Sequence, residues 1–196
     1  MPGLIEDYAI IGNCESAALV GRDGSIDWLA LPRFDSAACF AASAGRRRWQ
    51  IIPKDHSRIT RRYREGTLVL ETGSKHMVAR SPWSTAWAVE TAAPISFALS
   101  GGRRGSVELR MELVIRCEYG SVIPWVRRLD DGRHTAVAGP DRLTLSTPIK
   151  THGENLRTVA EFAVHAGEEI PFVLTWSPSF RSIPESADAA CTENAA

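Results

Sequence analysis

The chain has 196 residues, of which 44% are hydrophobic and 23% are charged, and this composition excludes a wholly disordered protein. Acidic and basic residues are equal in number, so the formal net charge is zero and nothing favours a nucleic acid or an anionic membrane as partner. No apolar run could span a bilayer, and no basic-then-apolar leader opens the chain, so we expect a cytoplasmic protein.

A hairpin is the first predicted element. Strands at 16–20 and 25–31 flank Gly-Arg-Asp-Gly, and Asp-Gly between apolar runs is a strong hairpin signal. Asp35 or Ser36 then has the chemistry of a helix N-cap ahead of an alanine-rich segment, which predicts one short helix near residues 36–44. Further strands are expected at 48–52, 58–63 and 67–72.

The clearest periodic pattern lies in the second half of the chain. Apolar and polar residues alternate from Val107 to Cys117, with a break only at Val114, which predicts a strand with one buried face. Later strands are expected at 122–129, 134–138, 143–147, 158–164 and 170–176. These elements predict an all-β fold, an antiparallel β-sandwich over residues 1–180, followed at 181–196 by a linker stub or disordered tail.

A series of segments resembles a known family. Residues 7–40, DYAIIGNCESAALVGRDGSIDWLALPRFDSAACF, look like the opening of bacterial trehalase-like and glucoamylase-like enzymes of glycoside hydrolase family 15. Later segments follow in the order of the family: GRRRWQIIP, RRYREGTLVLET, VELRMELVIRCEYG, AVAGPDRLTLSTP and FVLTWSPS. The resemblance covers most of residues 4–180 and implies a supersandwich-like N-terminal domain.

The same resemblance implies that this chain has no catalytic residue. In the family, two glutamates in a later (α/α)6 helical barrel perform hydrolysis, and 196 residues cannot contain that barrel. We therefore expect a non-catalytic module whose partner is the helical catalytic domain, and whose role is to shape the active-site rim. The alternatives are a standalone carbohydrate-binding module for α-glucosides, or a truncated remnant without activity. An exposed apolar face would favour self-association.

The loop after the predicted hairpin supplies the candidate rim residues, which are Trp28, Arg33, Phe34 and Asp35. An aromatic ring beside a guanidinium and a carboxylate suits a sugar, because the ring stacks on a pyranose while the charged groups bind its hydroxyls. In the alternative interpretation, Trp28 and Phe34 belong to the core and Arg33 pairs locally with Asp35. Turn, cap and strand positions explain the aspartates of this region without an acid–base pair.

No cofactor or metal site is predicted. The cysteines are widely spaced without a C-x-x-C pair, and the five histidines lack ligand spacing. A phosphate-binding loop, a dinucleotide fingerprint and a nucleophile elbow are all absent from the sequence. Three tryptophans at strand positions are expected in the core, with a platform for carbohydrate as the alternative, namely Trp49, Trp125 and Trp176.

Residues 73–101 depart from the family pattern, because they lack two alternating segments of the form AVVDCM and DIVRVV. Degenerate codons for residues 81–87 can be written so that a neighbouring reading frame yields AVVDCM, and the same offset converts 94–101 into DIVRVVG. We therefore hypothesise a local frame disruption that gives two core strands foreign side chains, Ser84 and Thr85 among them. Sequencing of the coding DNA tests this, and codons that cannot yield either string would refute it.

Overall fold

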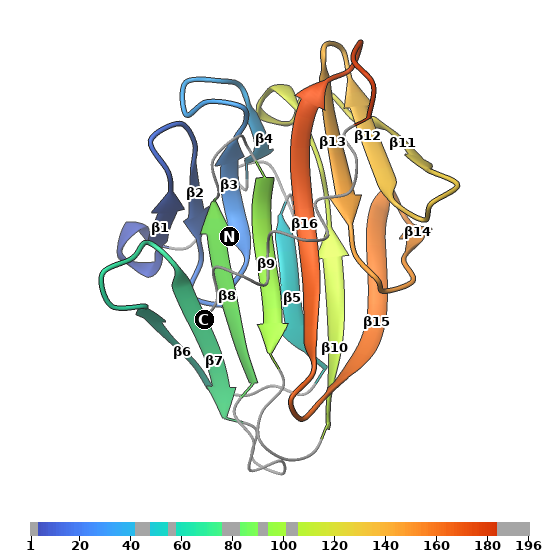
Figure 1. The fold of residues 1–196 in the computed structure, drawn as a ribbon. Coiled ribbons are helices and arrows are strands. Elements are labelled where there is room, and N and C mark those ends of the chain that lie inside the picture. Colours follow the sequence, from blue (N-terminus) through green and yellow to red (C-terminus); the bar gives the residue numbers. More distant parts are fainter. Residues whose placement is uncertain are drawn as a thin grey trace.

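The structure, a computed structural model, describes residues 4–41, 48–54, 58–75, 83–89, 94–100 and 106–183. Two large sheets stack face to face in these ranges (Figure 1). Neighbouring strands of each sheet pair antiparallel, as in the central pairs of β10 with β15 and of β13 with β16. The all-β antiparallel sandwich predicted from the sequence is confirmed.

The first sheet has the strand order β1-β2-β3-β5-β10-β15-β14, and β4 pairs with β3 beside this path. Its strands are β1 (Ala9–Gly12), β2 (Ala17–Val20), β3 (Ile26–Ala30), β4 (Ala38–Ala41), β5 (Trp49–Pro53), β10 (Ser106–Leu113), β14 (His152–Glu154) and β15 (Arg157–His165). The sheet therefore ends at β14 on one side.

The second sheet has the strand order β11-β12-β13-β16-β9-β8-β7-β6. Its strands are β6 (Arg58–Tyr63), β7 (Leu70–Lys75), β8 (Trp83–Val89), β9 (Pro94–Ser100), β11 (Trp125–Arg128), β12 (His134–Ala138), β13 (Asp141–Ser146) and β16 (Glu169–Pro178). The helical residues described are two single 3₁₀ turns, η1 (Ile5–Asp7) and η3 (Glu118–Gly120). No helix in the described part of the chain is long and apolar enough to cross a membrane.

The core lies between the sheets and draws alternate residues from each. On β10 the buried positions are Val107, Leu109, Met111 and Leu113, and the residues between them are exposed or half-buried. This period of two is the one that the sequence predicts. From the other sheet, β16 contributes residues of the same core cluster, namely Ile170, Phe172 and Leu174.

The prediction of a short helix near 36–44 is wrong. Residues 38–41 form strand β4, in which Phe40 lies opposite Leu29 of β3. Ala38, Cys39 and Phe40 are buried, so packing against the sheet overrides the helical propensity of alanine. Residues 42–47 lie outside the described residues.

The alternating strand ends earlier than its pattern predicts. β10 stops at Leu113, and the backbone N–H of Val114 donates to the carbonyl of Arg48 at 3.0 Å, outside regular pairing. The strand predicted at 122–129 is present as the shorter β11. Two short strands, β1 and β14, were not predicted.

Both strands of the atypical 73–101 region are present. β8 pairs with β7 on one side and with β9 on the other, and β9 continues the sheet to β16. Residues 73–101 therefore supply two strands despite their unusual pattern. The side chains of β8 and β9 lie outside the described residues, so the frame hypothesis stays a prediction.

Thiol reactivity should follow burial. Burial, together with the nearby Cys117 thiol, raises the pKa of Cys39 to about 12, and burial with the nearby Asp141 raises that of Cys117 to about 11. Cys14 is exposed. Because the thiolate is the reactive form, we expect a disulfide reagent at pH 8 to modify Cys14 fast and the other two only after unfolding.

The measurement uses the Cys191→Ser variant, since Cys191 lies outside the described residues. Fast modification of two or more thiols in the folded protein would contradict this packing of β4.

Candidate functional site

The loop that joins β3 to β4 carries three of the four predicted rim residues. It is fastened to the neighbouring 13–16 turn, because Ser16 Oγ donates to the carbonyl of Pro32 at 2.6 Å. The N–H of Phe34 donates to the carbonyl of Glu15 at 2.8 Å. Ser16 is buried, so the loop has a rigid base, and its Leu31-Pro32 peptide bond is cis.

Arg33 and Asp35 form a two-bonded ion pair within this loop. Arg33 Nε and Nη2 donate to the two carboxylate oxygens of Asp35 at 2.9 and 3.0 Å. The hydrogen bond and the attraction to Asp35 raise the pKa of Arg33, and the hydrogen bond from Arg33 lowers the pKa of Asp35. Both side chains are exposed. This is the local pairing that one of the two sequence interpretations predicts.

Phe34 and Trp28 differ in their surroundings. The Phe34 side chain is 62% exposed, so the core position considered for it is wrong and its ring is available for contact. Trp28 lies on β3 opposite Leu19 and Ala41 and is half-buried. Trp28 belongs to the strand and not to the loop, so the loop itself brings together Arg33, Phe34 and Asp35.

Stability of the loop should depend on Ser16 and not on Asp35. Ser16→Ala leaves the Pro32 carbonyl without its donor, which should lower the free energy of unfolding by about 0.5–1.5 kcal/mol. Asp35→Ala removes an exposed ion pair and no helix cap, so its free energy of unfolding should stay unchanged. Chemical denaturation of both variants measures this, and a larger loss for Asp35→Ala would show that the carboxylate has a structural role.

The aspartates of the first hairpin form a structural network. Ser25 Oγ lies 2.6 Å from Asp23 Oδ1 and 2.7 Å from Asp27 Oδ1, and the Tyr8 hydroxyl donates to Asp27 Oδ2 at 2.9 Å. The N–H of Ser25 also donates to Asp23, closing the turn at Gly24, whose φ of +80° suits glycine. These contacts explain both aspartates without catalysis.

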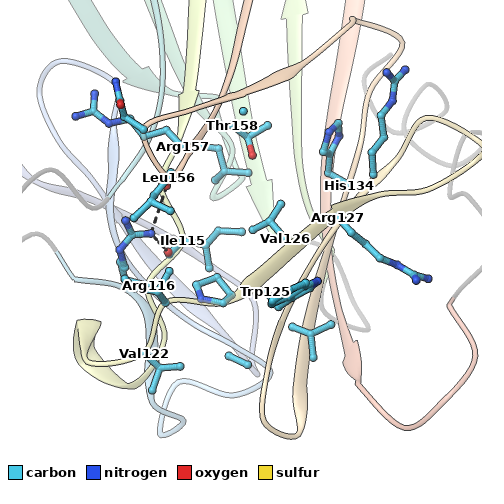
Figure 2. A pocket seen from close by; sticks show the side chains of 18 of the residues that line it. Ile115, Arg116, Val122, Trp125, Val126, Arg127, His134, Leu156, Arg157 and Thr158 are labelled. Carbon is cyan, nitrogen blue, oxygen red and sulfur yellow. Dashed lines mark hydrogen bonds between the residues drawn. The ribbon is translucent and has the colours of Figure 1, made fainter.

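A cavity of about 960 Å³ lies at a different place, on the open side of the sandwich. The terminal strands of the two sheets, β11 and β14, both contribute residues to its walls. Thr158 of β15 lines it from the first sheet and Ile115 from the segment after β10, and Val126 and His134 line it from the second sheet (Figure 2). The sequence did not predict this cavity, because its walls come from separate stretches between 113 and 158.

Strand β11 is exposed along its whole length. All four of its residues are exposed, and Trp125 has 80% of its surface in solvent. The expectation that Trp125 is a core residue is therefore wrong, whereas Trp49 is fully buried as predicted. Trp176 is half-buried and donates its indole N–H to Asp141 at 2.8 Å. The WVRR segment lacks alternation, which is the one sequence signal that could have identified an exposed edge strand.

Positive charge surrounds the cavity. Within the described residues, Arg127 and Arg128 form no ion pair, whereas Arg157 on the opposite wall pairs with Glu112. Burial, assisted by Arg128, lowers the pKa of His134, whose ring is hydrogen-bonded to Thr151 Oγ1 at 3.0 Å. The lowered pKa favours the neutral form of the His134 ring near pH 7. The positive charge beside this cavity therefore comes from arginines.

The last described segment of the chain is held beside this cavity. Arg142 is buried, and its Nη2 donates to the carbonyls of Arg181 at 2.8 Å and Ser182 at 2.9 Å. The N–H of Ser179 donates to the carbonyl of Pro140, and its hydroxyl donates to the carbonyl of Gly139, which lines the cavity. Residues 178–182 are thus held against the β12–β13 turn. Residues 184–196 lie outside the described residues.

The described residues do not suggest a metal site. Among them, no three His, Cys, Asp or Glu side chains gather where they could hold a metal ion.

Comparisons with known proteins agree with the fold. The family described as "Trehalase-like, N-terminal" matches residues 2–179. A trehalase of Mycolicibacterium smegmatis is 26% identical over 222 residues, which cover 94% of this chain and 32% of that protein. A trehalase of Mycobacterium tuberculosis is 38% identical over 73 residues, covering 35% of this chain and 10% of the relative. The chain therefore spans about a third of the first relative, and the match over nearly its whole sandwich shows that it belongs to the trehalase-like N-terminal domain family.

Proposed function

We propose that this chain is the non-catalytic N-terminal module of a trehalase-type enzyme of glycoside hydrolase family 15. It packs on a helical catalytic barrel, and the loop with Arg33, Phe34 and Asp35 contributes to the rim of the active site. One observation carries the proposal: 94% of the chain aligns with a trehalase of which it covers only 32%. The remaining two thirds of such an enzyme leave room for a separate catalytic domain.

The state of the carboxylates supports a non-catalytic role. Inverting hydrolysis requires a carboxylic acid with a raised pKa, roughly 6.5–9.5 Å from a second carboxylate. Within the described residues, hydrogen bonds from basic neighbours lower the pKa of Asp35, Asp131 and Glu161. Burial favours a raised pKa for Glu71, but Arg62 and Arg64 outweigh it and the pKa is lowered. None of these groups is suited to protonate a glycosidic oxygen near neutral pH.

A standalone module that binds α-glucosides is the second candidate. The exposure of Trp125 beside a cavity favours it, because indole rings stack on the apolar faces of sugars. Calorimetric titration of the purified chain with maltotriose and trehalose separates the candidates. Sugar binding that is lost in Trp125→Ala supports the standalone module. A chain that binds neither sugar supports the non-catalytic module of a trehalase-type enzyme.

Kinetics test the role of the rim. In an enzyme reassembled from this chain and a helical catalytic domain, Arg33→Ala and Phe34→Ala should raise KM for trehalose or lower kcat, while the melting temperature moves little. Both side chains are exposed, so their loss removes contacts with substrate or barrel and not core packing. Unchanged kinetics in both variants would leave the loop a structural element.

A further inference from the structure

We propose that the open side of the sandwich, between β11 and the β14–β15 hairpin, is the surface that binds the catalytic part of the enzyme. The partner surface on that catalytic part is apolar at its centre and carries carboxylates at its margin. This inference rests on the proposed function, because it names the face through which the module acts. It is separate from the rim loop, which joins β3 to β4.

The apolar character of this side comes from both sheets. Trp125 and Val126 of β11, Ile123 before it, and Leu156 in the β14–β15 turn all expose large parts of their side chains. They surround a cavity whose inner wall includes the buried residues Leu113 and Ile115. Soluble monomers rarely expose contiguous apolar patches of this kind. The patch therefore suits a surface that a partner covers.

The position of β11 in its sheet explains why the core is open here. β11 is the last strand of its sheet, and no strand of the described chain pairs with its outer edge. Val126 lies opposite the buried Ala136, so it faces the core side, while Trp125 points to the other side of the strand (Figure 2). Both sides of β11 are therefore available to one partner that wraps this edge.

Charge determines the chemistry of the partner's margin. Arg127 and Arg128 are exposed and form no ion pair with the described residues, in contrast to Arg110, which pairs with Glu154 and Glu161. Tryptophan and arginine are the residues most enriched at the energetic centres of interfaces. Two arginines without ion-pair partners beside an exposed tryptophan favour a protein surface with carboxylates.

The course of the chain favours the catalytic part as the occupant. Arg142 holds the carbonyls of Arg181 and Ser182, and Ser179 is bound to Gly139 on the wall of the cavity. The matched family is an N-terminal one, and two thirds of the M. smegmatis relative lie outside the alignment. In such an enzyme, the polypeptide that follows β16 would leave the sandwich next to this open side.

The experiment measures binding of this chain to the M. smegmatis trehalase from which the third that matches this chain has been removed, by calorimetry, together with trehalose hydrolysis by the mixture. Trp125→Asp and the double variant Arg127→Glu/Arg128→Glu should each weaken binding by about tenfold or more. Leu68→Asp is the matched control, because Leu68 is 55% exposed at the β6–β7 turn on the opposite edge of the same sheet. Its affinity should equal that of the unmodified chain, and thermal unfolding confirms that all variants are folded.

Each other outcome overturns the inference in a distinguishable way. Binding by the unmodified chain that both β11 variants retain would place the interface elsewhere and leave the proposed function intact. No binding by the unmodified chain would contradict the proposed function as well. Maltotriose binding lost in Trp125→Asp would identify a sugar site, and a dimer of the chain that Trp125→Asp dissociates would make a second copy the occupant.

Discussion

Replacement of Phe172 by alanine should lower the free energy of unfolding by about 3–5 kcal/mol, because it removes a large ring and leaves a cavity in the core. Phe172 is fully buried on β16, and its ring centroid lies 5.5 Å from that of Phe162, with the planes tilted by 41°. It belongs to the cluster that joins the two sheets. Urea denaturation followed by tryptophan fluorescence measures the change.

Phe180→Ala provides the matched control for this substitution. It removes the same ring from a position that is 79% exposed, so we expect a change within about 0.5 kcal/mol. Equal losses in the two variants would contradict the assignment of the core to the space between the sheets.

Arg142→Ala should release the end of the sandwich. The Arg142 guanidinium donates to Ser177 Oγ at 3.0 Å and to the carbonyls of Arg181 and Ser182. Hydrogen bonds to charged groups contribute about 1.5–3 kcal/mol, and we expect a loss of stability of this size. Trypsin should also cut after Arg181 several-fold faster, because the carbonyl of the scissile bond is no longer held.

Arg142→Lys separates charge from geometry. A single ammonium cannot reproduce the planar fork that reaches the Ser177 hydroxyl and two carbonyls together, so most of the loss should remain. Full recovery of stability and protease resistance by lysine would show that positive charge alone holds this segment.

Local sequence patterns predict those strands that are determined by turn residues or by alternation within a few neighbouring residues. Asp23-Gly24 between apolar runs located the β2–β3 hairpin, and the alternation after Val107 located β10. In contrast, the alanine-rich segment at 38–41 forms β4 because Phe40 meets Leu29 of β3. That contact forms through tertiary packing, and helix propensity describes only the local preference of the backbone.

The two candidate sites also differ in how far the sequence predicts them. The Arg33–Asp35 pair could be predicted, because its partners are two residues apart and adopt one turn. The open side of the sandwich could not, because Ile115, Trp125 and Leu156 meet only after both sheets have formed. Trp125 is exposed because β11 is the terminal strand of its sheet. The residue pattern of one strand does not reveal the position of that strand in the sheet.

The most direct test of a non-catalytic trehalase-type module is glucose release from trehalose by three samples. These are the purified chain, the M. smegmatis trehalase lacking its matched third, and the two together. We predict no release by the chain alone, and release by the mixture above that of the truncated trehalase. Glucose release by the chain alone, abolished by substitution of one of its own carboxylates, would contradict the account.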